Sequence, residues 1–97
     1  METVHVFVRL EPLAGKEAEF REALLRVAEP TRGESGCLGI RIFESLREPW
    51  VFTIHSEWVD EAAFELHARL PHTVRFLEVS EKLLTHAIQA LRTREIE

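Results

Sequence analysis

The chain has 97 residues, of which 45% are hydrophobic and 30% charged, a composition typical of a soluble globular protein. This length predicts one domain over residues 1–97. The formal net charge of −5 argues against a nucleic-acid partner, because phosphates require a basic protein surface. The sequence has no apolar run long enough to cross a membrane and no signal-peptide pattern, so we expect a cytoplasmic protein without a membrane partner.

The N-terminal segment Thr3–Leu10 alternates between apolar and mixed side chains, which predicts a β-strand. The apolar face of this strand carries Val4, Val6, Val8 and Leu10. From Lys16 to Glu29, apolar residues recur at helical spacing, which predicts an amphipathic helix. We expect Pro30 to end that helix.

Two more alternating segments predict a β-hairpin. The first is Cys37–Glu44 and the second is Trp50–Trp58, with a loop at Leu46–Pro49 between them. In the second segment, Phe52 and Ile54 share the apolar face with both tryptophans.

A proline divides the next helical region in two. Asp60 is a good N-cap for a helix that ends near Arg69, and Pro71 suits the first position of a helix that reaches about Leu83. The core candidates of this second helix are Val74, Phe76, Leu77, Val79 and Leu83. The segment His86–Arg94 is expected to form the closing strand.

The order β-α-β-β-α-β predicts an α+β fold, a ferredoxin-like sandwich with a four-stranded antiparallel sheet and helices on one face. Phe7 and Phe43 lie on the opposite sheet face, with Val51 as a further candidate, so this face is expected to be partly apolar. An exposed apolar patch of this kind usually marks an interface. We expect a two-fold homodimer that forms through the open sheet face.

His67 and His72 are the first candidates for chemistry. On one unbroken helix they would point about 140° apart, but the break at Pro71 lets both reach a cavity between the helices and the sheet. One interpretation is a general base or a hydrogen-bond donor, because histidine titrates near neutral pH. The other is structural, with His67 favourable near a helix C-terminus and His72 bonded to a nearby carbonyl.

The aromatic residues have two interpretations as well. Trp58 is either an aromatic wall for a planar ligand or a core residue, and Trp50 is interpreted as core. The phenylalanines Phe20, Phe52, Phe64 and Phe76 are first of all core residues, and a subset of them are candidates for lining a pocket. Cys37 is interpreted as a small buried hydrophobe.

The sequence predicts no metal site, because the five histidines and the single cysteine form no H-x-x-x-H, H-E-x-x-H or C-x-x-C pair. His5, His55 and His86 lie on three different predicted strands, and spacing alone does not show whether they converge. The sequence also contains no phosphate-binding glycine loop and no dinucleotide fingerprint.

Two motifs stand out in the chain. The more specific is W-x-D-x-x-A-x-x-x-H-x-x-x-P-H-x-x-x-F, here Trp58, Asp60, Ala63, His67, Pro71, His72 and Phe76. The segment E-S-G-C at Glu34–Cys37 is the second. With these motifs, nearly the whole chain resembles the antibiotic biosynthesis monooxygenase family, including its quinol monooxygenase type.

The resemblance implies a dimeric α+β barrel that oxygenates a phenolic or quinol substrate with dioxygen, without metal, flavin or haem. It implies His67 and His72 as base and donor, with Trp58 and Phe76 as walls of the substrate site; Phe64, Phe20 and Phe52 are further candidates for substrate binding. The chain departs from the family in having His55 and Ser56 where Tyr-Glu is frequent. It has no tyrosine at all, and its residues do not match the set that haem-degrading relatives use.

The predicted function is that of a monooxygenase for a small aromatic substrate. Two alternatives use the same fold: a non-catalytic small-ligand-binding or sensing module, and a small-metabolite isomerase.

Overall fold

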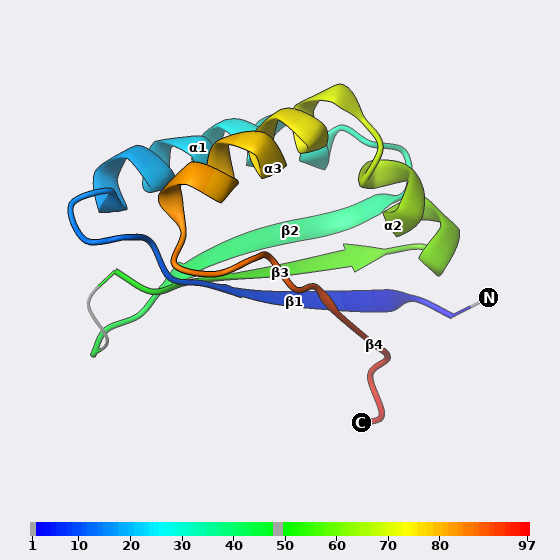
Figure 1. Cartoon of the computed structure of the whole chain (residues 1–97). Helices are drawn as coiled ribbons and strands as arrows, with labels where there is room; N and C mark the ends of the chain where they lie inside the picture. The colour runs from blue at the N-terminus through cyan, green and yellow to red at the C-terminus, as the bar shows by residue number, and fades with distance from the viewer. Residues whose placement is uncertain (1, 48–49) are drawn as a thin grey trace.

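The computed structural model describes residues 2–47 and 50–97. Its elements are β1 (Val4–Leu10), α1 (Glu17–Arg32), β2 (Cys37–Glu44), β3 (Phe52–Trp58), α2 (Glu61–His67), α3 (Pro71–Leu83) and β4 (Leu91–Thr93) (Figure 1). This order confirms the ferredoxin-like α+β fold. The predicted loop Leu46–Pro49 includes positions 48 and 49, which lie outside the described residues.

The four strands form one antiparallel sheet in the order β2-β3-β1-β4. In the register, Val8 of β1 and Ile42 of β2 both lie opposite Ile54 of β3, so the apolar faces of the three strands are aligned. The helices lie on one face of this sheet, with α1 and α3 side by side (Figure 1). The opposite face carries no helix in the described part of the chain.

The core lies between the helices and the sheet, where the apolar faces of β1 and β3 pack against the apolar face of α1. Its most deeply buried side chains are Val6, Leu10, Phe20, Leu24 and Trp58. Trp50 is not a core residue, which corrects the sequence interpretation: its side chain is 49% exposed and its φ angle is +63°. It precedes β3, which begins at Phe52, so the sheet does not hold it against the core.

Pro30 does not end α1, contrary to the sequence prediction, since the helix continues to Arg32. A proline near the C-terminal end removes one backbone hydrogen bond but leaves the following turn free to form. In that turn the buried Thr31 hydroxyl donates a 2.6 Å hydrogen bond to the Val27 carbonyl oxygen. The helix therefore reaches the loop that precedes β2.

The inner face of α3 differs from the predicted one. Phe76 and Leu83 are buried as expected, but Val74, Leu77 and Val79 are exposed to a third or more. Thr73 and Ser80 are buried instead, and both are hydrogen-bonded, so their burial leaves no polar group unpaired. The buried stripe thus has helical spacing but is partly polar.

The C-terminal strand is shorter than predicted. The sequence predicts a strand over His86–Arg94, whereas β4 contains Leu91–Thr93 only. The residues before it run from the end of α3 to the edge of the sheet beside β1 (Figure 1). No helix among the described residues is long and apolar enough to cross a membrane.

Gly36 is required where the loop after α1 meets α2. A Cβ atom at this position would lie 2.5 Å from the Cβ of Ala63, and the Gly36 carbonyl oxygen accepts a hydrogen bond from Val59. We expect Gly36→Ala to lower the free energy of unfolding by about 1–3 kcal/mol, because packed atoms must move apart. Urea unfolding measures this change. Gly33→Ala is the control, since its added Cβ meets only the Pro30 oxygen at 3.6 Å; equal stabilities of the two variants would contradict the packing.

Candidate functional site

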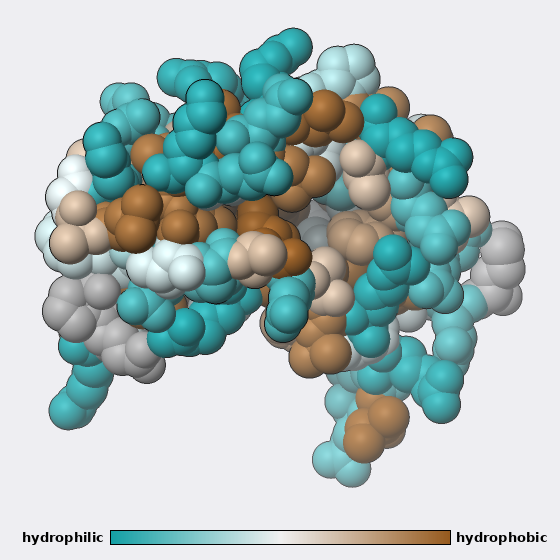
Figure 2. All heavy atoms as spheres, in the orientation of Figure 1, coloured by the Kyte–Doolittle hydropathy of each residue, from teal (hydrophilic) through white to brown (hydrophobic). Residues whose placement is uncertain are grey.

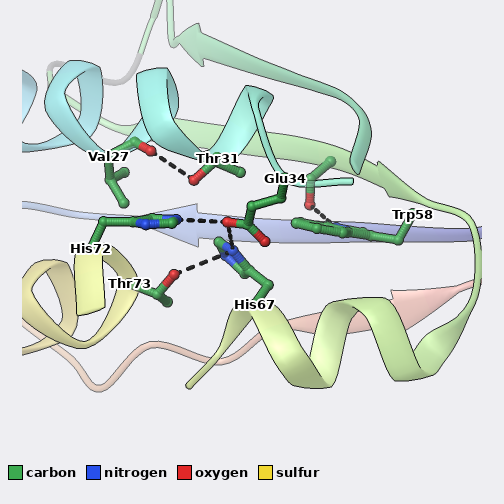
Figure 3. A network of polar contacts seen from close by, with 8 residues as sticks. Val27, Thr31, Glu34, Trp58, His67, His72 and Thr73 are labelled. Carbon is green, nitrogen blue, oxygen red and sulfur yellow. Dashed lines mark hydrogen bonds and ion pairs between the residues drawn. The ribbon is translucent and has the colours of Figure 1, made fainter. Parts of the chain in front are cut away.

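A single carboxylate joins the two histidines that the sequence singled out. Oε2 of Glu34 lies 2.8 Å from Nδ1 of His67 and 2.6 Å from Nε2 of His72 (Figure 3). The three side chains are only 11%, 14% and 20% exposed, respectively. Their contacts are therefore largely shielded from water. Hydrogen bonds to a charged group are stronger in such a shielded environment than in water.

The break between α2 and α3 produces this convergence. Asp60 caps α2 by accepting a 2.8 Å hydrogen bond from the Ala63 amide, and His67 is the last residue of that helix. Leu70 is extended, with φ −74° and ψ 149°, and Pro71 starts α3. His72 thus lies in the first turn of a new helix. The imidazole centroids of His67 and His72 are 6.0 Å apart, as the break at the proline predicts.

The geometry assigns protons to the two imidazoles. An ionised carboxylate can only accept hydrogen bonds, so the nitrogens that face Glu34 must carry hydrogen. These are Nδ1 of His67 and Nε2 of His72. A neutral His67 ring then has its lone pair on Nε2, and this is the arrangement in which a carboxylate orients a histidine as a general base.

Other side chains hold the His67 ring in place. The Thr73 hydroxyl lies 3.2 Å from Nδ1, and the Trp58 ring is 4.7 Å away between centroids. The Trp58 indole nitrogen donates a 2.9 Å hydrogen bond to the Ser56 hydroxyl, so the tryptophan is itself fixed (Figure 3). These contacts fix the orientation of the His67 ring.

His67 lines a cavity of about 270 Å³ between the helices and the sheet. Its walls are mostly apolar, from β1, β3, α1 and α3, with Ser56, Thr73 and Thr31 as polar members. Because the Ser56 oxygen accepts from Trp58, the Ser56 hydroxyl hydrogen remains available as a donor. Figure 2 shows apolar surface around the recess beneath the helical layer.

The C-terminal segment closes one side of this cavity with Ile88, Ala90 and Arg92. Arg92 donates hydrogen bonds of 2.9 Å to Glu61 and 3.2 Å to Glu65, and its guanidinium lies 5.1 Å from the centre of the Phe64 ring. The hydrogen bonds to the two carboxylates raise the pKa of Arg92. These contacts connect β4 to α2 across the edge of the cavity.

The two histidines do not line one cavity, and this corrects the sequence expectation. Within the described part of the chain, His72 lines a separate groove of about 180 Å³ between α1 and α3, where Arg26 and Arg75 also lie. Only His67 lines the larger cavity. The two rings are connected by their contacts with Glu34 and do not share a cavity.

Two of the five predicted aromatic residues line the cavity. Phe64 and Phe76 belong to its walls, whereas Trp58, Phe20 and Phe52 are buried in the core outside its described lining. Trp58 still contacts the site, because its ring packs against His67.

Glu34 lies at the centre of the site, although no periodicity or spacing in the sequence predicts a role for it. Its signal was the E-S-G-C marker, but an acidic residue in a loop has no periodicity that would reveal its contacts. Among the other histidines, Nδ1 of His5 lies 2.9 Å from Nε2 of His55 on the open sheet face. His86 is elsewhere, and its Nε2 accepts a 3.0 Å hydrogen bond from the Glu11 amide.

The chain is similar to known proteins along most of its length. The family described as antibiotic biosynthesis monooxygenase matches residues 3–79. An uncharacterized protein of Synechocystis is 32% identical over 69 residues, which are 71% of this chain but only 47% of that relative. The matched region thus spans about half the length of this relative.

Solved structures share the fold. A Pseudomonas aeruginosa protein, PA3566, superposes with a TM-score of 0.92 at 22% identity, covering 100% of this chain and 97% of its own. A Deinococcus radiodurans protein, itself a candidate antibiotic biosynthesis monooxygenase, has a TM-score of 0.88 at 27% identity. That match covers 97% of this chain and 93% of the other.

Cys37 follows Glu34 by three residues, and its partly buried side chain packs against the core. Burial, and to a smaller extent the charge of Glu34, raises the pKa of the Cys37 thiol. Because the thiolate is the reactive form, alkylation by iodoacetamide should reach half its maximal rate at a higher pH in the folded protein than in urea. A pH–rate profile measures both midpoints. A folded midpoint at or below the unfolded one would contradict the assigned environment.

Proposed function

Because the chain belongs to the antibiotic biosynthesis monooxygenase family, we propose that it oxygenates a phenolic or quinol-type aromatic molecule without metal, flavin or haem. The observation that carries this proposal is the Glu34–His67 contact at the wall of an apolar cavity. The contact supplies an oriented base, and the cavity supplies a space of limited polarity for an aromatic ring.

His67 is the proposed base. The Nε2 atom of His67 has no hydrogen-bond partner among the described residues. Every fully buried side-chain nitrogen or oxygen among these residues has a partner, so Nε2 must be accessible to solvent or ligand. A phenol bound beside it would give its proton to Nε2, while Glu34 stabilises the resulting imidazolium through Nδ1. His72 acts as a positioning residue, because its hydrogen bond fixes the Glu34 oxygen that also contacts His67.

The chemistry balances without a cofactor. Loss of the phenolic proton makes the ring electron-rich, and the phenolate transfers an electron to dioxygen. The substrate radical and superoxide combine at a ring carbon to form a peroxide, which then loses water. One oxygen atom remains as a quinone carbonyl, the other leaves as water with two substrate hydrogens, and the substrate itself supplies all the electrons.

The cavity suits this reaction because a dry environment strengthens the hydrogen bonds that stabilise developing negative charge. The Ser56 hydroxyl is the proposed donor to the substrate oxygen, since its oxygen is already occupied by Trp58. A volume of about 270 Å³ lies near the lower end for ligand sites, which favours a small aromatic molecule.

A second candidate function is ligand binding without turnover. It is favoured by the predominance of apolar lining, which can hold an aromatic molecule without any chemistry. Under this alternative the Glu34–histidine contacts only stabilise the fold. Measurements of oxygen consumption and of ligand binding on the same preparation separate the two candidates.

We also propose that two copies of the chain pair through the open sheet face. Phe7 and Phe43 are 41% and 50% exposed there, and Phe7 stacks on His55 with ring centroids 4.7 Å apart. Leu91 of β4 adds further exposed apolar surface. Such a face is self-complementary under two-fold symmetry, and pairing would remove it from water.

We expect the double variant His67→Ala with His72→Ala to lower quinol-dependent oxygen consumption by roughly 10²–10⁴-fold, because base catalysis contributes that much. An oxygen electrode measures the rate, with circular dichroism as a check of folding. His86→Ala is the control, because His86 is exposed and contacts Glu11 instead of the site.

An unchanged rate in the double variant would reject the role of the histidines. Wild-type protein that binds aromatic molecules but consumes no oxygen would favour the binding module.

For the pairing, we expect the double variant Phe7→Glu with Phe43→Glu to be monomeric, because carboxylates buried without partners oppose association. Sedimentation equilibrium gives the mass of each species. Leu66→Glu, at an exposed apolar position of α2, is the matched control and should remain a dimer. A wild-type protein that sediments as a monomer would contradict the proposed pairing.

A further inference from the structure

We propose that Glu34, His67 and His72 form a binding site for one divalent transition-metal ion of the Zn²⁺ type. The proposal concerns metal binding by these residues and does not require that the protein is an oxygenase. Spacing in the sequence indicated no such site, since the three residues come from the loop after α1, the end of α2 and the first turn of α3.

The three candidate ligand atoms lie close together. Oε2 of Glu34, Nδ1 of His67 and Nε2 of His72 all lie within 4.8 Å of one another. Two imidazoles and a carboxylate are a ligand set that binds Zn²⁺ in proteins, with the fourth position left for water or another ligand. Tetrahedral bonds of about 2.0–2.2 Å place ligand atoms about 3.3–3.6 Å apart.

A small movement would admit the ion. The Glu34 oxygen now lies 2.8 Å from the His67 nitrogen and 2.6 Å from the His72 nitrogen, so metal binding requires each of these distances to lengthen by roughly 0.5–1 Å. All three groups lie on rotatable side chains. None of them would have to leave its helix or loop.

The surroundings of the three side chains are suited to binding a metal ion in a fixed position. The three side chains are mostly buried, and Trp58 packs against the His67 ring at 4.7 Å. Thr73 lies 3.2 Å from Nδ1 and can contact the ligand shell. Arg26 and Arg75 line the same groove as His72, so a water-derived hydroxide or a carboxylate is a suitable fourth ligand.

Metal binding has a chemical consequence for His67. A metal on Nδ1 uses the lone pair there, so the proton of the neutral ring must reside on Nε2. His67 would then be unable to take a proton from a substrate in the cavity. This consequence rests on the proposed function, under which the ion would inhibit oxygenation.

The test is a calorimetric titration of chelator-treated protein with Zn²⁺, together with a visible-absorption titration with Co²⁺. We expect one equivalent of Zn²⁺ per chain and the intense visible bands of four-coordinate Co²⁺. Glu34→Gln and His72→Asn should each weaken Zn²⁺ binding by at least roughly 100-fold, because each removes a ligand. His86→Ala, which alters an exposed histidine outside the site, should bind as the wild type does.

Absence of a stoichiometric Zn²⁺ isotherm would overturn the site, and so would equal affinity in wild type, Glu34→Gln and His72→Asn. Loss of binding in His86→Ala would also overturn it, because the ion would then be bound elsewhere. Oxygen consumption is measured separately. Metal binding by a protein that consumes no oxygen would support the metal site and reject the oxygenase activity. Oxygen consumption by a protein that binds no Zn²⁺ would support the oxygenase activity and reject the metal site.

Discussion

The hydrogen bonds from two imidazoles to one carboxylate oxygen are the interaction on which the site depends. They connect the α1–β2 loop to both α2 and α3. Hydrogen bonds to a charged group contribute about 1.5–3 kcal/mol each, which is enough to fix the orientation of both rings. Without Glu34, His67 would keep its packing against Trp58 but would lose the partner that determines which nitrogen carries the proton.

The proposed base chemistry and the proposed metal binding use the same three side chains, so the two would compete. In the hydrogen-bonded state the His67 lone pair is on Nε2, and His67 lines the apolar cavity. In a metal-bound state that lone pair would lie on Nδ1 and face Glu34. The proposed metal-bound form would therefore differ from the hydrogen-bonded form in the proton positions of both rings, because Nδ1 of His67 and Nε2 of His72 must each lose hydrogen to bind a metal.

The sequence predicted the fold because its signals are local and periodic. Alternation on β1, the Asp60 cap and the extended residue before Pro71 each depend on neighbours in the chain, and all three are confirmed. Glu34 could not be placed in this way, since its partners lie 33 and 38 residues away and approach only in the folded chain. The burial of Thr73 and Ser80 on α3 was not predicted for a related reason. Hydrogen bonds satisfy both hydroxyl groups, and hydropathy does not include those bonds.

The position of the protons on the two rings is the most direct measurement of the central interaction. Long-range ¹H–¹⁵N correlation spectra of the histidine side chains distinguish Nδ1-protonated from Nε2-protonated rings. Hydrogen on Nδ1 of His67 and on Nε2 of His72 is the predicted result in the metal-free wild type, with both assignments disturbed in Glu34→Gln. A wild-type His67 ring protonated on Nε2 alone, or spectra that Glu34→Gln leaves unchanged, would contradict the account.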